Sequence, residues 1–261
     1  MLRRRDLLLL PFALTPLALS PARAADVAGF RRAAFDAHTM AELSTALGLA
    51  APSPSADVVL QAPELSEDGA VVPVSMACAL PGVQRLLLCV EKNPTLLAAM
   101  FELRAGTEAS FATRLKMQQS SPVHALAVFA DGRVLSASRE VRVTVGGCVG
   151  AGDMVPERAD QPTLIRVQRS ATGAVVRALM KHDMESGQRK DGSGRTVPAW
   201  HIQEVVARVN GEPVWQAQWG TAVSRNPFVQ FALKGVKSGD RIALSWADNR
   251  GAQRSDEVAV A

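Results

Sequence analysis

Cys148 lies in the stretch "EVRVTVGGCVGAGDMVPERADQP", residues 140–162, where a strand-like run gives way to glycines on both sides of the thiol: Gly146, Gly147, Gly150 and Gly152. A cysteine thiolate is a nucleophile that forms and breaks sulfur–sulfur bonds when a reagent can reach it. Glycines remove side-chain bulk and leave the backbone mobile, so a partner protein could accept such a thiol in a narrow pocket. The pattern predicts a reactive thiol. A cysteine incidental to a glycine-rich linker and an intermolecular disulfide remain as alternatives.

Cys78 and Cys89 lie in two successive strand-like runs, residues 70–80 and 83–93, on either side of the turn signal Pro81-Gly82. If the runs pair as a hairpin, the two cysteines face each other and are candidates for a disulfide. The alternative is that both are buried and act as small hydrophobic side chains. Because the count of three is odd, both alternatives leave Cys148 as the odd thiol.

A second group of chemically active side chains lies in "HDMESGQRKDGSGRTVPAWHI", residues 182–202. An acid and base constellation is one interpretation of its charges, a solvated loop with internal ion pairs is the favoured one, and a docking surface lies between them. The residues that could form such a constellation are Glu185, Arg189, Lys190, Asp191 and Arg195.

Conventional catalytic and metal-binding patterns are not found in the sequence. No two histidines stand at metal-ligand spacing, and Cys-x-x-Cys and Gly-x-Ser-x-Gly are absent. The glycines at 146–152 are not followed by the Lys-Ser/Thr pair of a phosphate loop. We therefore predict no metal and no cofactor, and a classical hydrolase or nucleotide enzyme is disfavoured.

The rest of the chain reads as elements that would position Cys148. Residues 27–49 carry apolar side chains at mostly helical spacing, and 50–56 form a connector rich in proline and serine. Seven short, often alternating runs follow between 57 and 145, and seven more follow between 163 and 261. Asn210-Gly211 is a hairpin turn signal within the second series. The fold class predicted is mainly β, with two antiparallel sandwich domains and a short N-terminal helical segment.

The first 24 residues combine an arginine cluster, an apolar stretch and an Ala-Arg-Ala ending. They predict a secretory signal peptide of the general or twin-arginine type, cleaved near Ala24, and a mature chain outside the cytoplasm. Without this leader the chain has 25 basic and 24 acidic residues, so its charge gives no support to nucleic-acid binding. No later apolar run is long enough to cross a membrane.

The residues quoted above resemble a known pair of families. "AVFADGRVLSASREVRVTV" running into "TVGGCVG" resembles the C-terminal half of SoxY, whose chain ends in a Gly-Gly-Cys-Gly-Gly arm. "HDMESGQRKDGSGRTVPAWHIQEVVARVNGEPVWQAQW", followed by "SRNPFVQFALKG", resembles SoxZ, the partner of SoxY. The chain thus looks like a SoxY–SoxZ fusion.

The resemblance implies two immunoglobulin-like domains that pair within one chain in the periplasm. It implies that Cys148 carries a sulfur intermediate, as an S-thiosulfonate and then a persulfide, with Gly146, Gly147 and Gly150 as arm residues. The implied partners are a haem protein that loads thiosulfate, a hydrolase that releases sulfate and a sulfur dehydrogenase. The resemblance also implies that the protein is a carrier on which these enzymes act, with no catalytic residues of its own, and so is not an enzyme. The implied docking loop comprises Met184, Glu185, Arg189, Lys190 and Asp191.

The predicted organisation places the signal peptide at 1–24 and a SoxY-like domain at 25–147, with its helical lead-in at 27–49 and its sandwich at 57–147. An arm and linker follow at 148–161, and a SoxZ-like sandwich at 162–261.

Two features depart from the family pattern. Val149 interrupts the second glycine pair, and residues 151–161 tether the arm to the second domain, so the arm sweeps less volume than a free end. The alternative function is an adaptor or binding module for a periplasmic quinoprotein-type dehydrogenase, without covalent cargo.

Overall fold

The computed structural model describes residues 31–147 and 161–261. The first half holds a short 3-10 helix, η1 (Arg32–Asp36), the helix α1 (Met40–Leu47) and nine strands: β1 (Ser53–Pro54), β2 (Val58–Gln61), β3 (Leu65–Asp68), β4 (Val72–Cys78), β5 (Val83–Val90), β6 (Leu97–Leu103), β7 (Thr107–Leu115), β8 (Ser121–Phe129) and β9 (Val134–Val145). The second half holds seven strands: β10 (Leu164–Arg169), β11 (Gly173–Leu179), β12 (Ile202–Val209), β13 (Glu212–Trp219), β14 (Phe228–Lys234), β15 (Arg241–Asp248) and β16 (Gln253–Ala259). The predicted mainly β fold class is confirmed.

Local sequence pattern accounts for most strands. β4 and β15 alternate buried and more exposed residues, as expected of strands with one face on a core. The end of β5 and the start of β6 are instead buried on both faces. The second sheet covers one side of these strands, and the N-terminal helices cover the other.

The helical lead-in forms in the described part of its predicted range. The side chain of Thr39 accepts a hydrogen bond from the backbone N–H of Glu42 and caps the start of α1, and Gly48 ends the helix with a φ of 61°. Leu43 and Leu47 of α1 pack with Leu87 and Met100 on the outer face of β5 and β6. The helices therefore cover an apolar face that would otherwise meet water.

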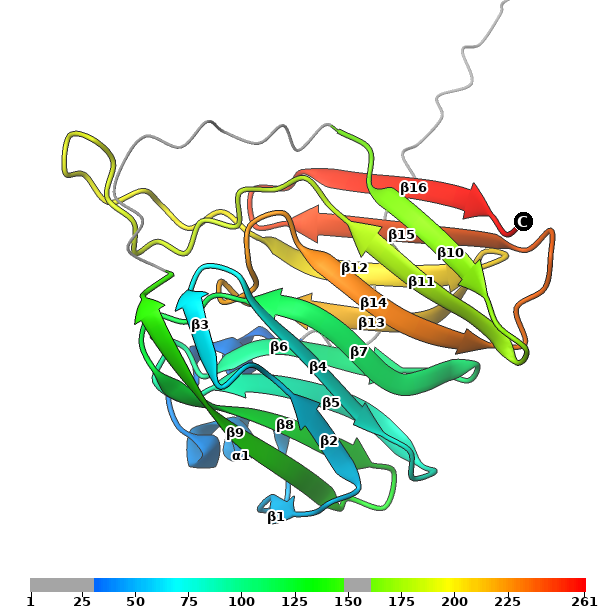
Figure 1. Ribbon diagram of the computed structural model, residues 1–261, viewed down its shortest axis with the longest axis horizontal. Helices are drawn as coiled ribbons and strands as arrows, with labels where there is room; N and C mark the ends of the chain where they lie inside the picture. Colours follow the sequence, from blue (N-terminus) through cyan, green and yellow to red (C-terminus); the bar gives the residue numbers. More distant parts are fainter. Residues whose placement is uncertain (1–30, 148–160) are drawn as a thin grey trace, which may run out of the picture.

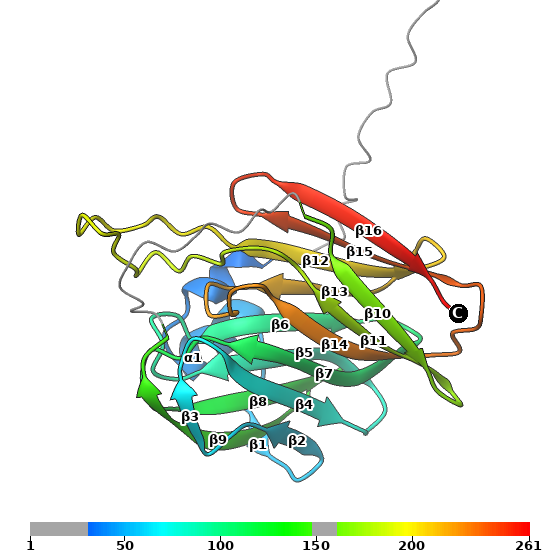
Figure 2. The same ribbon diagram turned by 45° about the horizontal axis from the view of Figure 1, so that its top comes forward.

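The strands form two layers that run through both halves of the chain (Figures 1 and 2). One sheet has the order β1-β9-β8-β5-β6-β13-β12-β15-β16, with β3 also paired to β9, and the other has the order β10-β11-β14-β7-β4-β2. The two halves join twice by antiparallel pairing, β6 with β13 and β7 with β14. The halves thus share both sheets, a closer union than the packing of two separate sandwiches.

An aromatic cluster from both halves fills the space between the layers at this junction. The ring centroids of Phe101 and Phe111 lie 4.2 Å apart, and Trp215 lies 5.5 Å from Phe111 and 4.9 Å from Phe231. All four side chains are almost completely buried in one continuous core. Aromatic contacts of this kind add to burial, so the junction belongs to the core of the protein.

Cys78 and Cys89 are both free and buried, which matches the second of their two alternatives. The hairpin on which the disulfide alternative depended does not form, because β4 and β5 belong to different sheets. Val58 lies opposite Cys78 in the ladder, whereas Leu97 and His124 lie opposite Cys89. The turn at Gly82 carries the chain from one layer to the other, so no disulfide joins these residues.

In the described ranges, no helix is long and apolar enough to span a membrane.

Candidate functional site

The strand β9 leads to the candidate site. Cys148 and Gly150 lie outside the described residues, whereas Gly146 and Gly147 are the last residues described before the thiol. The part of the site that can be described is thus the backbone from which Cys148 extends.

That backbone is held by hydrogen bonds to two other segments. The N–H of Gly147 donates to the carbonyl oxygen of Met117 over 2.8 Å, and the N–H of Met117 donates to the carbonyl of Gly69 over 2.7 Å. The N–H of Gly69 in turn donates to the carbonyl of Val145 over 2.8 Å. We call Gly69, Met117, Gln118, Gly146 and Gly147 the arm root.

Glycine is required in the arm root because backbones approach one another closely there. A Cβ added to Gly147 would lie 2.1 Å from the carbonyl of Gly69, and one added to Gly146 would lie 2.3 Å from the carbonyl oxygen of Gln118. A Cβ on Gly69 would lie 2.5 Å from the carbonyl oxygen of Met117. These distances are far inside van der Waals contact. The sequence suggested mobility for Gly146 and Gly147, but both are packed against neighbouring backbone.

Two buried polar residues that sequence reasoning missed stand behind the arm root. Asn93, which is 8% exposed, donates from Nδ2 to the carbonyl of Lys116 over 2.8 Å and accepts at Oδ1 from the N–H of Gln118 over 3.0 Å. Lys116 is 7% exposed and donates from Nζ to the carbonyl oxygen of Met184 in the second half. The sequence signal at Asn93 was the Asn93-Pro94 turn, and nothing in the pattern singled out Lys116.

The same segment is also joined to the second half through its backbone. The N–H of Lys116 donates to the carbonyl of Ala222 over 2.6 Å, and the N–H of Ser224 donates to the carbonyl of Arg114 over 3.0 Å. A bridge between Leu115 and Val223 completes this pairing. The end of β7 therefore contacts the second half on one edge and leads into the arm root.

Met184 is held in an unusual conformation by several contacts. Its φ of 52° is in the left-handed region, which is costly for a side chain of this type. Its N–H donates to Nδ1 of His182 over 3.0 Å, and its sulfur accepts from the N–H of Ile202 over 3.3 Å. Met184 is fully buried. The sequence predicted it as part of a docking loop, but a buried residue cannot present its side chain to a partner.

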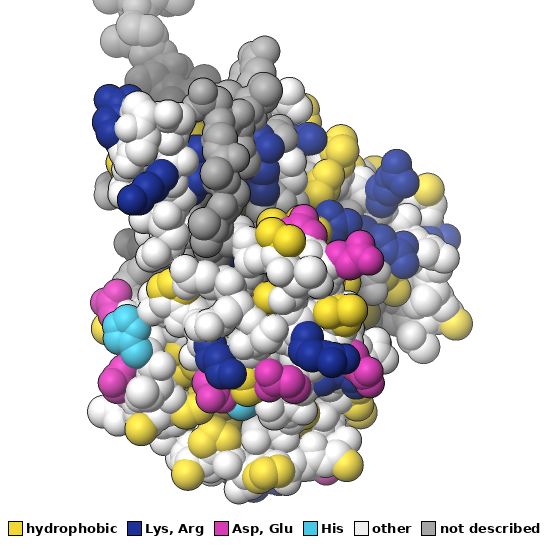
Figure 3. All heavy atoms as spheres, turned by 60° about the vertical axis from the view of Figure 1, so that its left-hand side comes forward, with side chains coloured by type: hydrophobic (Ala, Val, Ile, Leu, Met, Phe, Trp, Pro, Cys, Tyr) yellow, Lys and Arg dark blue, Asp and Glu magenta, His cyan; other side chains and the backbone are white. Residues whose placement is uncertain are grey.

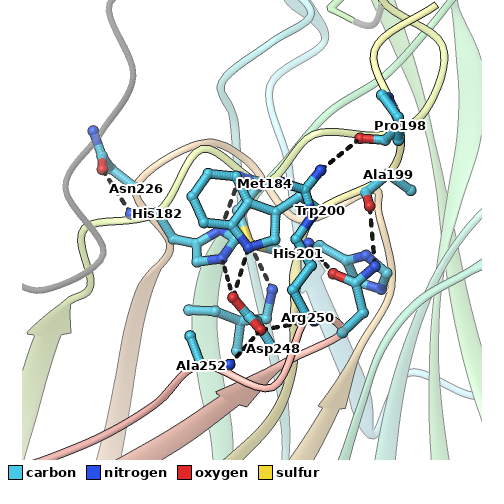
Figure 4. A network of polar contacts seen from close by, with 12 residues as sticks. His182, Met184, Pro198, Ala199, Trp200, His201, Asn226, Asp248, Arg250 and Ala252 are labelled. Carbon is cyan, nitrogen blue, oxygen red and sulfur yellow. Dashed lines mark hydrogen bonds and ion pairs between the residues drawn. The ribbon is translucent and has the colours of Figure 1, made fainter.

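Figure 4 shows the network that holds His182. Because Nδ1 of this ring accepts from Met184, Nε2 carries the proton and donates to Oδ2 of Asp248 over 3.3 Å. The same carboxylate oxygen accepts from the indole N–H of Trp200 over 2.6 Å, and Oδ1 accepts from the N–H of Arg250 over 2.8 Å. A neutral histidine with its proton on Nε2 therefore has a hydrogen-bond partner at each ring nitrogen.

The network shifts the protonation of both its titratable members. Burial lowers the pKa of His182 below its ordinary value, and the hydrogen bond and charge of Asp248 offset this only in part. Burial acts to raise the pKa of Asp248, but the hydrogen bonds from Trp200, from the backbone N–H groups of Arg250 and Ala252 and from His182 together lower it. The pair is thus a neutral histidine beside a carboxylate at neutral pH.

The charged segment 182–200 contains internal ion pairs. Arg189 donates from Nε and Nη2 to Oε1 of Glu185 at 2.9 and 2.6 Å, and both side chains are largely buried. Arg195 pairs with Asp191 at 3.2 Å, and Asp191 also accepts from the N–H and hydroxyl of Ser193. This matches the favoured interpretation of a loop with internal ion pairs. Among the predicted docking residues Lys190 is exposed, whereas Met184 and Glu185 are buried.

The loop and the arm root share one end of the molecule. The segment between β11 and β12 projects on the same side as the tips of β3 and β9 (Figures 1 and 2). On the face seen in Figure 3, basic and acidic side chains lie next to one another over the lower half. Charge of one sign therefore does not mark the lower half of this face, whereas basic side chains predominate in its upper half. In the parts of the chain that are described, no cluster of three His, Cys, Asp or Glu side chains could hold a metal ion.

Comparisons with known proteins divide the chain in two. A family model described as "Sulfur oxidation protein SoxY" matches residues 43–148, and one described as "Sulphur oxidation protein SoxZ" matches residues 165–259. No curated protein matches the chain. The first family match ends at Cys148 itself.

Solved structures resemble parts of the chain. The sulfur carrier protein SoxY from Chlorobium limicola f thiosulfatophilum is 26% identical, over 40% of this chain and 93% of its own, with a TM-score of 0.36. A superoxide reductase (neelaredoxin) from Ignicoccus hospitalis is 16% identical, over 33% of this chain and 78% of its own, with a TM-score of 0.30. A marsupial T cell receptor is 7% identical, over 77% of this chain and 99% of its own, with a TM-score of 0.25.

Proposed function

Since the chain belongs to the SoxY and SoxZ families, with both domains fused in one polypeptide, we propose that it is a covalent carrier of sulfur-oxidation intermediates and that Cys148 holds them. The observation that carries this proposal is the arm root, a fixed base whose last residue, Gly147, directly precedes the thiol. The carrier is a substrate of partner enzymes and performs no catalysis of its own.

The chemistry requires only an accessible sulfur on this chain. In loading, the Cys148 thiol and thiosulfate form a sulfur–sulfur bond and give the cysteine S-thiosulfonate. One proton is released to water, and a haem partner accepts the two electrons. Water then releases the terminal sulfonate as sulfate and leaves a persulfide on Cys148. A sulfur dehydrogenase takes six electrons from the remaining outer sulfur while water supplies its oxygens, and hydrolysis of the resulting S-sulfonate releases sulfate and restores the Cys148 thiol. These partners are part of the proposal and follow from the family.

The position of Cys148 limits how it meets these partners. Cys148 directly follows Gly147 in the sequence, and the N–H of Gly147 is hydrogen-bonded within the arm root. A partner must therefore approach the arm root closely, and the exposed part of the 182–200 loop, with Lys190, is the second surface that we propose it contacts.

The fused architecture supports this role. In a two-chain carrier the SoxY and SoxZ parts must find each other, whereas a tether raises their effective concentration. Here the two halves also share both sheets and one core. The proposed cellular location is the periplasm, reached by the predicted signal peptide and its cleavage near Ala24. Mass spectrometry of protein exported by its host would identify the mature N-terminus.

The test of the carrier function is an intact mass measurement. The mature chain is incubated with thiosulfate, the haem partner and an electron acceptor. We expect a mass gain of one thiosulfate group on Cys148 that a thiol reductant removes, and no gain in Cys148→Ser. An unmodified wild-type chain beside a partner that loads another SoxY would refute the proposal. The alternative, an adaptor for a periplasmic dehydrogenase without cargo, predicts that Cys148→Ser supports sulfur oxidation as well as wild type does.

A further inference from the structure

The segment Lys116–Gln118 has a partner for each of its backbone groups from the first N–H to the last. The N–H of Lys116 donates to Ala222 in the second half, and the N–H and carbonyl of Met117 bond to Gly69 and Gly147 in the arm root. The carbonyl of Lys116 and the N–H of Gln118 both bond to the side chain of Asn93. The segment is therefore a short connector between the second half and the residue before Cys148.

Asn93 acts as a clip on this connector. Its amide spans the residues on either side of Met117, accepting from one and donating to the other. The bond to the carbonyl of Lys116 is buried and the bond from the N–H of Gln118 is partly buried, so the Lys116 carbonyl in particular loses its partner without a ready replacement from solvent when Asn93 is removed. By holding both neighbours of Met117, the Asn93 side chain orients the N–H of Met117 toward Gly69 and its carbonyl toward Gly147.

Lys116 ties the connector to the loop of the second half. A lysine is rarely buried unless its ammonium group is paired, because removing the charge from water is costly. Here Nζ reaches the carbonyl oxygen of Met184, whose own backbone is held by His182. The connection therefore runs from the His182 network through Met184 and Lys116 to Met117 and Gly147, by contacts between described residues.

We propose that Asn93 and Lys116 are positioning residues for Cys148. They set the place of the arm root relative to the second half, so the SoxZ part helps to present the thiol through the residues that precede it. The link from this placement to sulfur loading rests on the proposed function, whereas the placement itself can be measured without any partner enzyme.

The test uses the full mature chain and the variants Lys116→Met, which keeps side-chain length but removes the donor, and Asn93→Ala. Lys116→Arg is the conservative rescue, and Val176→Ala in β11 is a core control distant from the arm root. The first readout is amide hydrogen exchange of Gly147 and of residues 69–72. We expect Lys116→Met, which loses one buried hydrogen bond, to speed this exchange by roughly tenfold, and Asn93→Ala, which loses two hydrogen bonds, to speed it by roughly tenfold or more. Lys116→Arg and the core control should stay within about twofold of wild type.

The second readout separates positioning from general damage. Alkylation of Cys148 by iodoacetamide in the native protein needs no docking, so the variants should react within about threefold of wild type. Loading of thiosulfate by the haem partner should fall by roughly tenfold in the same variants, because the partner meets a displaced arm root.

Three outcomes would overturn the inference: unchanged exchange at Gly147 in both variants, equal acceleration in the core control, or full partner loading despite faster exchange. If Lys116→Met does not fold, Asn93→Ala decides the question alone. If the wild-type chain is never loaded, the proposed function fails, while the exchange data still decide whether these residues position the arm root.

Discussion

The backbone N–H of Gly147 donates to the carbonyl oxygen of Met117 over 2.8 Å, and Cys148 is the next residue in the chain. This bond joins the end of the first half to a segment that is itself bonded to the second half. The thiol therefore extends from a point at which both halves meet. Fusion of the two parts leaves this point internal to the chain, and backbone hydrogen bonds hold its base.

Thiol counting tests whether Cys148 is the one cysteine open to chemistry. Cys78 and Cys89 are free and buried, and burial strongly raises the pKa of Cys89. A buried neutral thiol reacts slowly, because the thiolate is the nucleophile. We expect one equivalent of maleimide to react with the native mature chain and three with the denatured chain. In Cys148→Ser the native count should be zero, and a native count of two or more would contradict the buried placement.

The arm root should be sensitive to a single methyl group. In Gly69→Ala the new Cβ would meet the carbonyl oxygen of Met117 at 2.5 Å and the nitrogen of Gly147 at 2.8 Å, so backbone must shift. We expect a loss of about 1–3 kcal/mol in the free energy of unfolding, the usual cost of overpacking. Urea denaturation measures it. The neighbouring exposed Glu67→Ala should stay within about 0.5 kcal/mol of wild type, and equal stability of the two variants would argue against the close packing of the arm root.

The buried histidine should make stability depend on pH. Because burial lowers the pKa of His182 in the folded protein, the unfolded chain binds the proton more readily between that value and the ordinary pKa of about 6.5. The contribution of His182 to the free energy of unfolding should therefore be complete above pH ~6.5, and stability should fall as the pH drops below this value. The contribution of Asp248 has the same sign but begins only below pH ~3.8.

His182→Gln separates these contributions, since an amide can accept from Met184 and donate to Asp248 without titrating. We expect this variant to lose the slope of stability between pH 5 and 6.5, in chemical denaturation at a series of pH values. His124→Gln, at a partly exposed histidine paired with Glu91 over 2.8 Å, is the control and should keep the slope. Persistence of the slope in His182→Gln would assign it to another group.

The loop between β11 and β12 should divide into a structural base and an exposed tip. Glu185→Gln leaves the largely buried guanidinium of Arg189 without its carboxylate, so we expect a loss of roughly 1–3 kcal/mol in stability. Lys190→Ala should leave stability within about 0.5 kcal/mol of wild type, because its side chain is exposed. If the tip contacts partners, the same variant should slow thiosulfate loading, with the change lying in the association rate. Unchanged loading by Lys190→Ala would remove this residue from the docking surface.

Local pattern in the sequence was enough to find most elements. The alternating runs predicted β2, β4 to β9 and all seven strands of the second half, and Asn210-Gly211 lies at the predicted hairpin turn with φ values of 51° and 87°. β1 and β3 were missed because they are short and lie in segments rich in proline or charge. Runs of alternating side chains indicate one buried face, which is a property of the strand alone.

Pairing between strands could not be predicted in the same way. A hairpin that would place Cys78 and Cys89 face to face was compatible with the local pattern, but the turn at Gly82 leads from one layer to the other. The pairing of β6 with β13 and of β7 with β14 joins residues more than a hundred positions apart, and no local period encodes such a choice.

The sequence by itself determined the strand content, the helical lead-in and the single cysteine that stands apart in a glycine segment, because these depend on side-chain pattern and composition. Only the tertiary structure decided that Gly146 and Gly147 are packed against other backbone segments, and that the buried Asn93 and Lys116 stand behind them. The physical reason is that close backbone approach and burial of polar groups depend on which distant segments meet in space.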